Sequence, residues 1–416
     1  MLTHQQKLDR LVRLGLEISQ IADLDLLLEK VLTEARHLLH ADAGSIYIKE
    51  NDHLRFSYSQ NDYLQKRLER GKKLIYTTFT LPIDNFSIAG FVANNGSILN
   101  IPDAYKLDNS YPFSFNPKFD QISGYHTHSM LTIPMKNSRG DIVGVLQLIN
   151  AQNDQGKIIP FPKEDEPIVQ HFAIYAANAI ERAQMTRTTI ERMISMAELR
   201  DPKETGPHAN RVASYAVVIY EAWGRKKQLA QEEIDRKRDS LRLAAMLHDV
   251  GKVAISDVIL KKPGRLDENE YAIMKQHTIH GARLFQNARS EFDEYSAIVA
   301  LNHHERWDGK GYPGHVDIET GKPLPGFENK NGSAKGKREE EIPLFGRIVA
   351  LADVYDALSS KRVYKQAWHE ERVLDELQKE RGKQFDPLVV DCFFERLDEV
   401  RAIAKRYPDK QTNDSR

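Results

Sequence analysis

The stretch LRLAAMLHDVGK, residues 241–252, ends an apolar helical run with an imidazole and a carboxylate side by side, His248 and Asp249. Leucine, alanine and methionine have high helix propensity and are usually buried. A buried helix that ends in this pair offers nitrogen and oxygen ligands suited to a hard or borderline divalent metal. Adjacent His-Asp pairs also occur by chance on protein surfaces, so the hypothesis needs support from elsewhere in the chain.

Two other segments supply that support. His-His-Glu at 303–305 closes the apolar segment 296–301, and Asp353 stands at the end of a third apolar segment that begins at 348. A charged residue in such a segment is rarely buried without a partner or a metal. Six of the fifteen histidines fall between residues 208 and 304, so the histidines are concentrated in one region.

Composition narrows the classes of protein that the chain can represent. Its 416 residues predict two to three domains, and 59 basic against 60 acidic residues give a net charge of −1. This balance argues against a non-specific binder of nucleic acid polymers. The only cysteine is Cys392, which excludes an intrachain disulfide and a four-cysteine iron–sulfur cluster. With no signal peptide and no run of ~20 apolar residues, the sequence predicts a soluble cytoplasmic protein without membrane contact.

The hydrophobic periodicity changes along the chain. Residues 5–40 have apolar positions at helical spacing, whereas 43–48, 54–58, 130–135 and 142–149 read as strands, which indicates an α+β domain. From 165 to about 200 an apolar stripe predicts one long helix. This helix is either a connector or dimer seam between domains, or it packs on its own domain. After residue 200 the pattern is helical, except for an exposed loop expected at 314–341.

Taken together, HDVGK at 248–252, HHERWDGKGYP at 303–313 and DVYDAL at 353–358 resemble the HD-GYP family of bacterial cyclic dinucleotide phosphodiesterases over about residues 185–405. This resemblance implies an all-α bundle that hydrolyses cyclic di-GMP to the linear dinucleotide or GMP. It assigns metal ligation to a set of residues in which Asp249 bridges the metals: His208, His248, Asp249, His277, His303, His304 and Asp353. A glutamate four residues before the first histidine, Glu204, resembles a third-metal ligand, so two or three ions, iron or manganese, are expected.

The resemblance also implies roles around the metals. Lys252 is expected to neutralise phosphate charge or assist the leaving oxygen, and Arg362 and Lys365 to grip the ligand phosphates. Tyr312 is expected to shape the substrate pocket, in a loop that in the family is proposed to contact diguanylate cyclase domains. Here Gly314-His315 and the long insertion after it depart from the family pattern. These departures leave 3′,3′-cyclic GMP-AMP as an alternative substrate.

Residues from about 5 to 182 resemble a GAF domain, a small-molecule sensor fold. The resemblance rests on residues 131–135 and 144–150. It also rests on a spaced Asn-Lys-Phe-Asp-Glu motif, of which the chain has Asn150, Phe161, Asp165 and Glu166. Ala151 stands at the lysine position, so the internal Lys–Asp pair of that motif is expected to be missing. The ligand of this domain is not specified by the sequence.

The sequence thus predicts an α+β GAF sensor domain joined by a long helix to an all-α HD-type bundle, with limits of 5–165, 166–200 and 201–405. We expect a homodimer in which the GAF domain regulates the phosphodiesterase. A third possibility, from another class, is a catalytically silent receptor that binds the dinucleotide and signals through the connecting helix.

Overall fold

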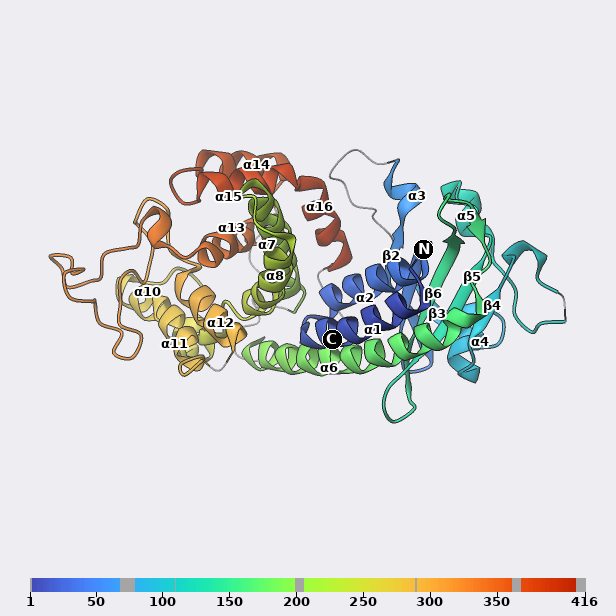
Figure 1. The fold of residues 1–416 in the computed structure, drawn as a ribbon. Coiled ribbons are helices and arrows are strands. Elements are labelled where there is room, and N and C mark those ends of the chain that lie inside the picture. Colours follow the sequence, from blue (N-terminus) through green and yellow to red (C-terminus); the bar gives the residue numbers. More distant parts are fainter. Residues whose placement is uncertain are drawn as a thin grey trace. The chain divides into compact units, whose positions relative to one another are not determined.

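The computed structural model describes residues 2–67, 79–108, 110–198, 206–288, 290–360 and 368–408. The chain forms two compact units, Met1–Arg187 and Thr188–Arg416, which are considered separately (Figure 1). The first is α+β and the second is helical, which confirms the predicted fold class.

The first unit is built on an antiparallel sheet, whose described strands lie in the order β3-β2-β1-β6-β5-β4, with β7 paired to β6. All four predicted strands are present, as β1, β2, β5 and β6, and they form the centre of the sheet. The sequence pattern missed the two strands that flank them, β3 and β4. The strands are β1 (Ala41–Glu50), β2 (His53–Asn61), β3 (Thr80–Pro82), β4 (Leu99–Ile101), β5 (Met130–Lys136), β6 (Ile142–Gln152) and β7 (Ile158–Ile159).

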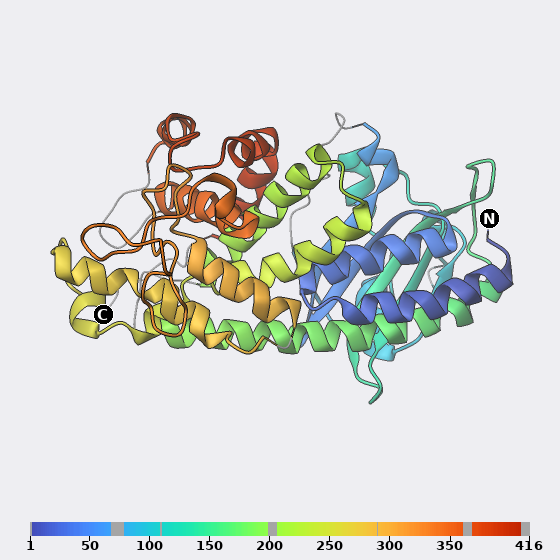
Figure 2. The same cartoon turned by 60° about the vertical axis from the view of Figure 1, so that its left-hand side comes forward.

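Three helices cover one face of this sheet, namely α1 (His4–Gln20), α2 (Leu24–Leu39) and α6 (Glu166–Glu198), and Figure 2 shows α1 and α6 side by side. Their apolar sides share one buried core with β1, β5 and β6. Asp23 caps α2 by accepting from the backbone N–H of Leu26. The opposite face carries α4 (Ile88–Asn95); the remaining short elements are α3 (Asp62–Gln65), η1 (Ala104–Lys106), α5 (Lys118–Ser123) and η2 (Lys163–Asp165).

A buried ion pair ties α1 to the start of α6. Lys7 Nζ lies 2.7 and 2.6 Å from the two carboxylate oxygens of Asp165, and the two residues are only 5% and 3% exposed. Ala151 leaves the motif without its internal Lys–Asp pair, as expected, but Asp165 is paired with a lysine from another part of the chain. This partner lies on α1, 158 residues earlier, where no local motif could reveal it.

We predict that Lys7→Met lowers the free energy of unfolding of the first unit by about 3 kcal/mol, because it leaves the Asp165 carboxylate buried and uncompensated. Adding Asp165→Leu should restore most of the loss, since the double variant buries no charge. Urea unfolding of the full chain, followed by probes in the first unit, measures both effects.

Arg10→Met is the matched control, since the Arg10–Glu34 pair joins a side chain that is 41% exposed to one that is 8% exposed. Arg10→Met should lower the free energy of unfolding by less than about 1 kcal/mol. Equal losses for Lys7→Met and Arg10→Met, or a double variant as unstable as the single one, would contradict the assignment.

The second unit is a bundle of helices, with no strand among the residues that the structure describes. Its elements are α7 (Gly206–Lys226), α8 (Gln231–Met246), η3 (Val250–Ala254), α9 (Asp257–Leu260), α10 (Glu268–Lys275), α11 (His277–Leu284), α12 (Glu291–Asn302), η4 (Glu339–Glu341), α13 (Leu344–Ser359), α14 (Glu370–Lys379), α15 (Pro387–Glu395) and α16 (Leu397–Arg406). Helix α7 packs against α8, α13, α15 and α16, and α12 packs against α8, α11 and α13. The segment 314–341 is a loop up to η4, as predicted.

Gly251 brings the turn after α8 into contact with α11. A Cβ atom at this position would clash with the backbone of His277 and Gly281, so only glycine permits the approach. The glycine two residues after Asp249 therefore has a packing reason: it lets the His-Asp turn lie against the start of the helix that carries His277.

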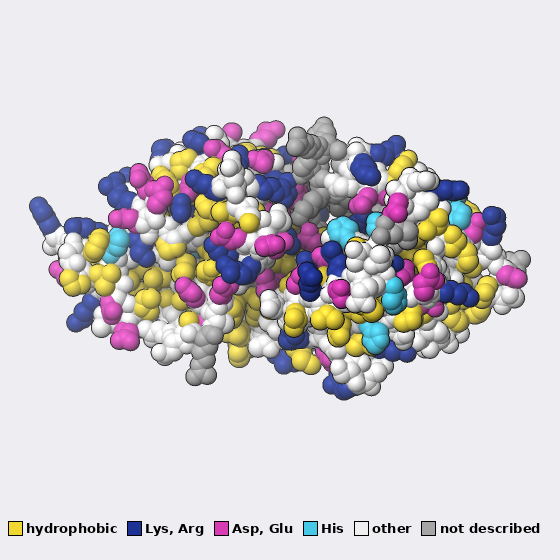
Figure 3. Space-filling model, in the orientation of Figure 1, with side chains coloured by type: hydrophobic (Ala, Val, Ile, Leu, Met, Phe, Trp, Pro, Cys, Tyr) yellow, Lys and Arg dark blue, Asp and Glu magenta, His cyan; other side chains and the backbone are white. Residues whose placement is uncertain are grey.

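Charged side chains of both signs are interspersed on the face drawn in Figure 3, in keeping with the near-neutral composition. Within the described ranges, none of the helices combines the length and the apolar character that a membrane span requires.

Candidate metal centre

Helix ends and short turns bring seven of the predicted ligands together in the second unit. His248 and Asp249 lie in the turn between α8 and η3, and His277 begins α11. His303 and His304 follow the last residue of α12. His208 lies in the first turn of α7, and Asp353 lies within α13.

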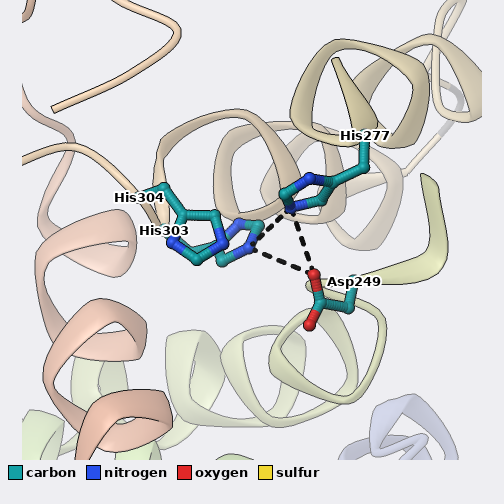
Figure 4. Close-up of side chains that lie close together, drawn as sticks. All are labelled: Asp249, His277, His303 and His304. Atoms are coloured by element: carbon teal, nitrogen blue, oxygen red, sulfur yellow. Dashed lines mark hydrogen bonds and ion pairs between the residues drawn. The ribbon is translucent and has the colours of Figure 1, made fainter. Parts of the chain in front are cut away.

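The first cluster contains Asp249, His277, His303 and His304, each of which offers one ligand atom within 4.8 Å of the others. Asp249 Oδ1 lies 3.2 Å from His277 Nε2 and 3.5 Å from His303 Nε2, and the two imidazole nitrogens are 3.4 Å apart. Figure 4 shows the side chains of His277 and His303 converging on the Asp249 carboxylate, with His304 beside His303.

The second cluster contains His208, His248 and Asp353, again with one ligand atom from each within 4.8 Å of the others. Asp353 Oδ1 is 3.6 Å from His208 Nε2 and 3.9 Å from His248 Nε2. Because these three residues come from α7, the turn after α8, and α13, the cluster depends on the packing of the whole bundle.

Asp249 connects the two clusters. Its Oδ1 faces His277 and His303, whereas its Oδ2 lies 3.2 Å from His248 Nε2 and 2.8 Å from Lys252 Nζ. One carboxylate thus contacts ligands of both clusters with different oxygens. A carboxylate that contacts both groups could bridge two metal ions, which is the role that the sequence resemblance implies for Asp249.

Hydrogen bonds to the backbone fix the orientation of three imidazoles. The Nδ1 atoms of His248 and His277 lie 2.9 and 2.8 Å from the carbonyl oxygens of Ala245 and Met274, and His303 Nδ1 lies 3.0 Å from that of Ala300. Since a carbonyl oxygen only accepts, Nδ1–H donates, and the lone pair of the neutral ring is on Nε2. Each Nε2 faces the cluster and can bind a metal there.

Electrostatics favour the protonation states that metals need at Asp249, His303 and His304. Burial raises the pKa of the Asp249 carboxyl, but the positive charge of Lys252 and the contacts from His248 and His277 outweigh it and hold that pKa well below its usual range. Burial lowers the pKa of His303, and burial together with His303 and His277 lowers that of His304 well below 6.5. An ionised carboxylate and neutral imidazoles fit a divalent metal such as iron or manganese.

Asp356 orients His208, a role that the sequence interpretation missed. Its Oδ2 lies 2.8 Å from His208 Nδ1, and its carboxylate also accepts from the guanidinium of Arg211 at 2.6 and 2.9 Å. Burial alone would raise the pKa of Asp356, but the bonds from His208 and Arg211 lower it to about 2. The spacing of three residues after Asp353, on the same side of a helix, is the feature that could have revealed it.

Glu305 anchors the loop that carries Tyr312. Its two oxygens accept from the backbone N–H groups of Gly314, at 2.5 Å, and Lys337, at 3.2 Å. Burial raises the pKa of this carboxyl to about 7. Glu305 thus holds Gly314 and Lys337, at the start and near the end of the long insertion, a role that the sequence analysis did not assign to it.

Tyr312 is placed at the centre by ring stacking on His304, with centroids 4.8 Å apart. Lys252 also lies there, through its bond to Asp249. Three predicted site residues, Glu204, Arg362 and Lys365, fall outside the described residues.

We predict that Asp356→Asn weakens metal binding about tenfold, because His208 loses the charged partner that fixes its ring and raises its basicity. Metal content after dialysis against a graded chelator series measures this. Ser360→Ala is the control, since Ser360 contacts the same carboxylate and Arg211 but not His208. Folded Asp356→Asn protein with wild-type metal affinity would contradict the role.

Comparison with protein families agrees with this architecture. Residues 23–180 match the family model described as GAF domain, and residues 205–358 match that described as HD domain. A second HD-domain model matches residues 328–389. The chain therefore carries a GAF domain followed by an HD domain, which confirms the pairing that the sequence resemblance predicted.

Curated relatives make the comparison more specific. The chain is 35% identical over 230 residues to a 3′3′-cGAMP-specific phosphodiesterase 2 of Vibrio cholerae, covering 55% of this chain and 38% of the relative. It is 36% identical over 231 residues to the cyclic di-GMP phosphodiesterase response regulator RpfG of Xanthomonas campestris, covering 56% and 53%. A probable cyclic di-GMP phosphodiesterase of Vibrio cholerae is 28% identical over 82% of this chain and 71% of its own length.

The chain thus spans about half or less of the length of the first two relatives. Their names and the two domains are consistent with the predicted HD-GYP family with an N-terminal GAF domain.

Proposed function

We propose that this protein is a metal-dependent phosphodiesterase that hydrolyses the phosphodiester bonds of cyclic di-GMP to the linear dinucleotide or GMP. The observation that carries the proposal is the pair of adjacent ligand clusters that share Asp249. Divalent ions bound there would withdraw charge from a phosphate group and activate water. The relatives named as cyclic dinucleotide phosphodiesterases support the substrate class.

The chain's own residues have distinct tasks in this reaction. Asp249 and the histidines hold the ions, and the lowered pKa values of Asp249, His303 and His304 favour the states that bind a metal. Lys252, with its ammonium 2.8 Å from Asp249, places a positive charge where the phosphate would bind. It neutralises developing negative charge or donates a proton to the leaving oxygen. We propose that Arg362 and Lys365 hold the phosphates and that Tyr312 closes the pocket.

A second substrate, 3′,3′-cyclic GMP-AMP, has a specific observation in its favour. The relative of this name in Vibrio cholerae is 35% identical to the chain. Rates measured side by side on the two dinucleotides decide which of them the enzyme prefers.

The first unit has a regulatory role in this proposal. A small molecule bound by the GAF domain would act on the phosphodiesterase through residues 166–200, between a sensor at 5–165 and a catalytic domain at 201–405. The protein would work in the cytoplasm as a homodimer, and its Tyr312 loop could contact a diguanylate cyclase domain. Sedimentation at micromolar concentration tests the dimer.

We predict that protein purified without oxygen and loaded with iron or manganese hydrolyses cyclic di-GMP, and that Asp249→Asn lowers kcat by at least about 100-fold, because ligands in both clusters lose their shared carboxylate. Product analysis by chromatography measures both the rate and whether hydrolysis stops after one bond.

Asp257→Asn is the matched control. Asp257 lies eight residues after Asp249, on α9, and its side chain is 52% exposed. It should keep the wild-type rate. Absence of turnover of any cyclic dinucleotide by metal-loaded wild-type protein would refute the proposed function.

We further predict that Glu204→Ala removes one equivalent of metal if Glu204 holds a third ion. Inductively coupled plasma mass spectrometry of anaerobic samples should then give three equivalents for the wild type and two for the variant. Two equivalents in both proteins would exclude the third ion.

A further inference from the structure

Three side chains form a wall beside the metal centre: Tyr271 and Lys275 of α10, and Tyr312 of the loop after α12. Tyr271 and Lys275 are four residues apart, so they lie on the same side of the helix. We refer to these three residues as the aromatic wall. Neither Tyr271 nor Lys275 belongs to the ligand clusters or to the site residues discussed above.

The wall extends outward from the metal ligands. Tyr312 stacks on His304 at 4.8 Å, and its ring lies 6.4 Å from that of His277. Tyr271 is one ring further out, 6.2 Å from Tyr312 and nearly perpendicular to it at 79°. Tyr271 is 47% exposed, whereas Tyr312 is mostly buried, so Tyr271 presents ring surface to solvent at the edge of the centre.

Lys275 adds a positive charge to this wall. Its Nζ lies 5.0 Å from the centroid of the Tyr271 ring and 5.7 Å from that of Tyr312. Among the residues that the structure describes, no carboxylate forms an ion pair with it. The ammonium group is therefore held by two aromatic rings, and its hydrogen-bond donors are available to a ligand.

Contacts at its N-terminal end help to hold helix α10, and with it Tyr271 and Lys275, in position. Asp267 caps its N-terminus in a capping box with Glu270, and the Glu270 carboxylate also accepts from Lys262 Nζ at 2.6 and 2.7 Å. These bonds tie α10 to the segment that follows α9. Stacking of a ligand on Tyr271 therefore requires little loss of protein conformational entropy.

From this geometry we propose that the aromatic wall recognises a guanine base of the substrate. The scissile phosphate has to lie at the metal ligands, and the base of the same nucleotide extends away from it, toward the position of Tyr271. Exposed aromatic rings stack on nucleobases. This inference rests on the proposed function, since it assumes that a cyclic dinucleotide binds at the metal centre.

Lys275 gives the wall its preference for guanine. An ammonium group only donates hydrogen bonds, and guanine offers two acceptors on one edge, O6 and N7. Adenine has an amino donor in place of O6, which opposes an ammonium group. The wall thus favours cyclic di-GMP, admits cyclic GMP-AMP through its single guanine, and disfavours cyclic di-AMP.

The test compares steady-state kinetics of metal-loaded wild-type protein and variants on cyclic di-GMP, cyclic GMP-AMP and cyclic di-AMP. Tyr271→Ala should raise KM for cyclic di-GMP about tenfold, with kcat changed less than about twofold, because stacking on the base is lost and the metals are untouched. Tyr271→Phe, which keeps the ring, should recover most of that loss.

Lys275→Met should reduce the preference for cyclic di-GMP over cyclic di-AMP, measured as a ratio of kcat/KM, by about tenfold. Ile273→Ala is the matched control, because Ile273 is 41% exposed on the same helix and lies outside the wall. Metal content and melting temperature of each variant confirm that the centre and the fold are intact.

Wild-type kinetics in Tyr271→Ala, or an unchanged base preference in Lys275→Met, would contradict guanine recognition by the aromatic wall. The proposed phosphodiesterase activity would stand in both cases. A fall in kcat with KM unchanged also overturns it, since the loss would then lie in the metal centre. Absence of turnover in the wild type overturns the proposed function and the wall together.

Discussion

The Asp249 carboxylate lies in the interior of the second unit, where an isolated negative charge would carry a large free-energy penalty. Its burial therefore requires positive charge nearby as compensation. Lys252, on η3, provides part of that compensation with its ammonium 2.8 Å from the carboxylate. The imidazoles of α11 and of the turn after α12 direct Nε2 at the same carboxylate. In the neutral rings these atoms carry lone pairs, so a cation bound between them and Asp249 would both compensate the buried charge and complete the packing around it.

Sequence patterns located most of this centre because its ligands lie where apolar helical runs end. His248, Asp249 and the 303–304 pair could be identified by this position, and Asp353 by a charge within an apolar segment. For Asp356, the spacing after Asp353 places it on the same side of α13, but its partner Arg211 is distant in the sequence. The role of Glu305 likewise depends on a distant partner, Lys337. Long-range contacts of this kind leave no local periodicity.

In the first unit the limits of prediction were similar. The central strands and the helices α1, α2 and α6 followed from alternation and helical spacing, whereas the short edge strands β3 and β4 carry too few residues for a pattern. The Lys7–Asp165 pair shows a further limit. Asp165 needs a cation wherever it is buried, but several segments of the chain can supply one, so a motif position does not determine the partner.

At Gly251, main-chain atoms of η3 and α11 are in direct contact, so the backbone limits how closely Asp249 and His277 can approach each other. Any adjustment of this part of the centre to a bound ion would therefore fall on side-chain rotation, because the two elements have no room to move closer.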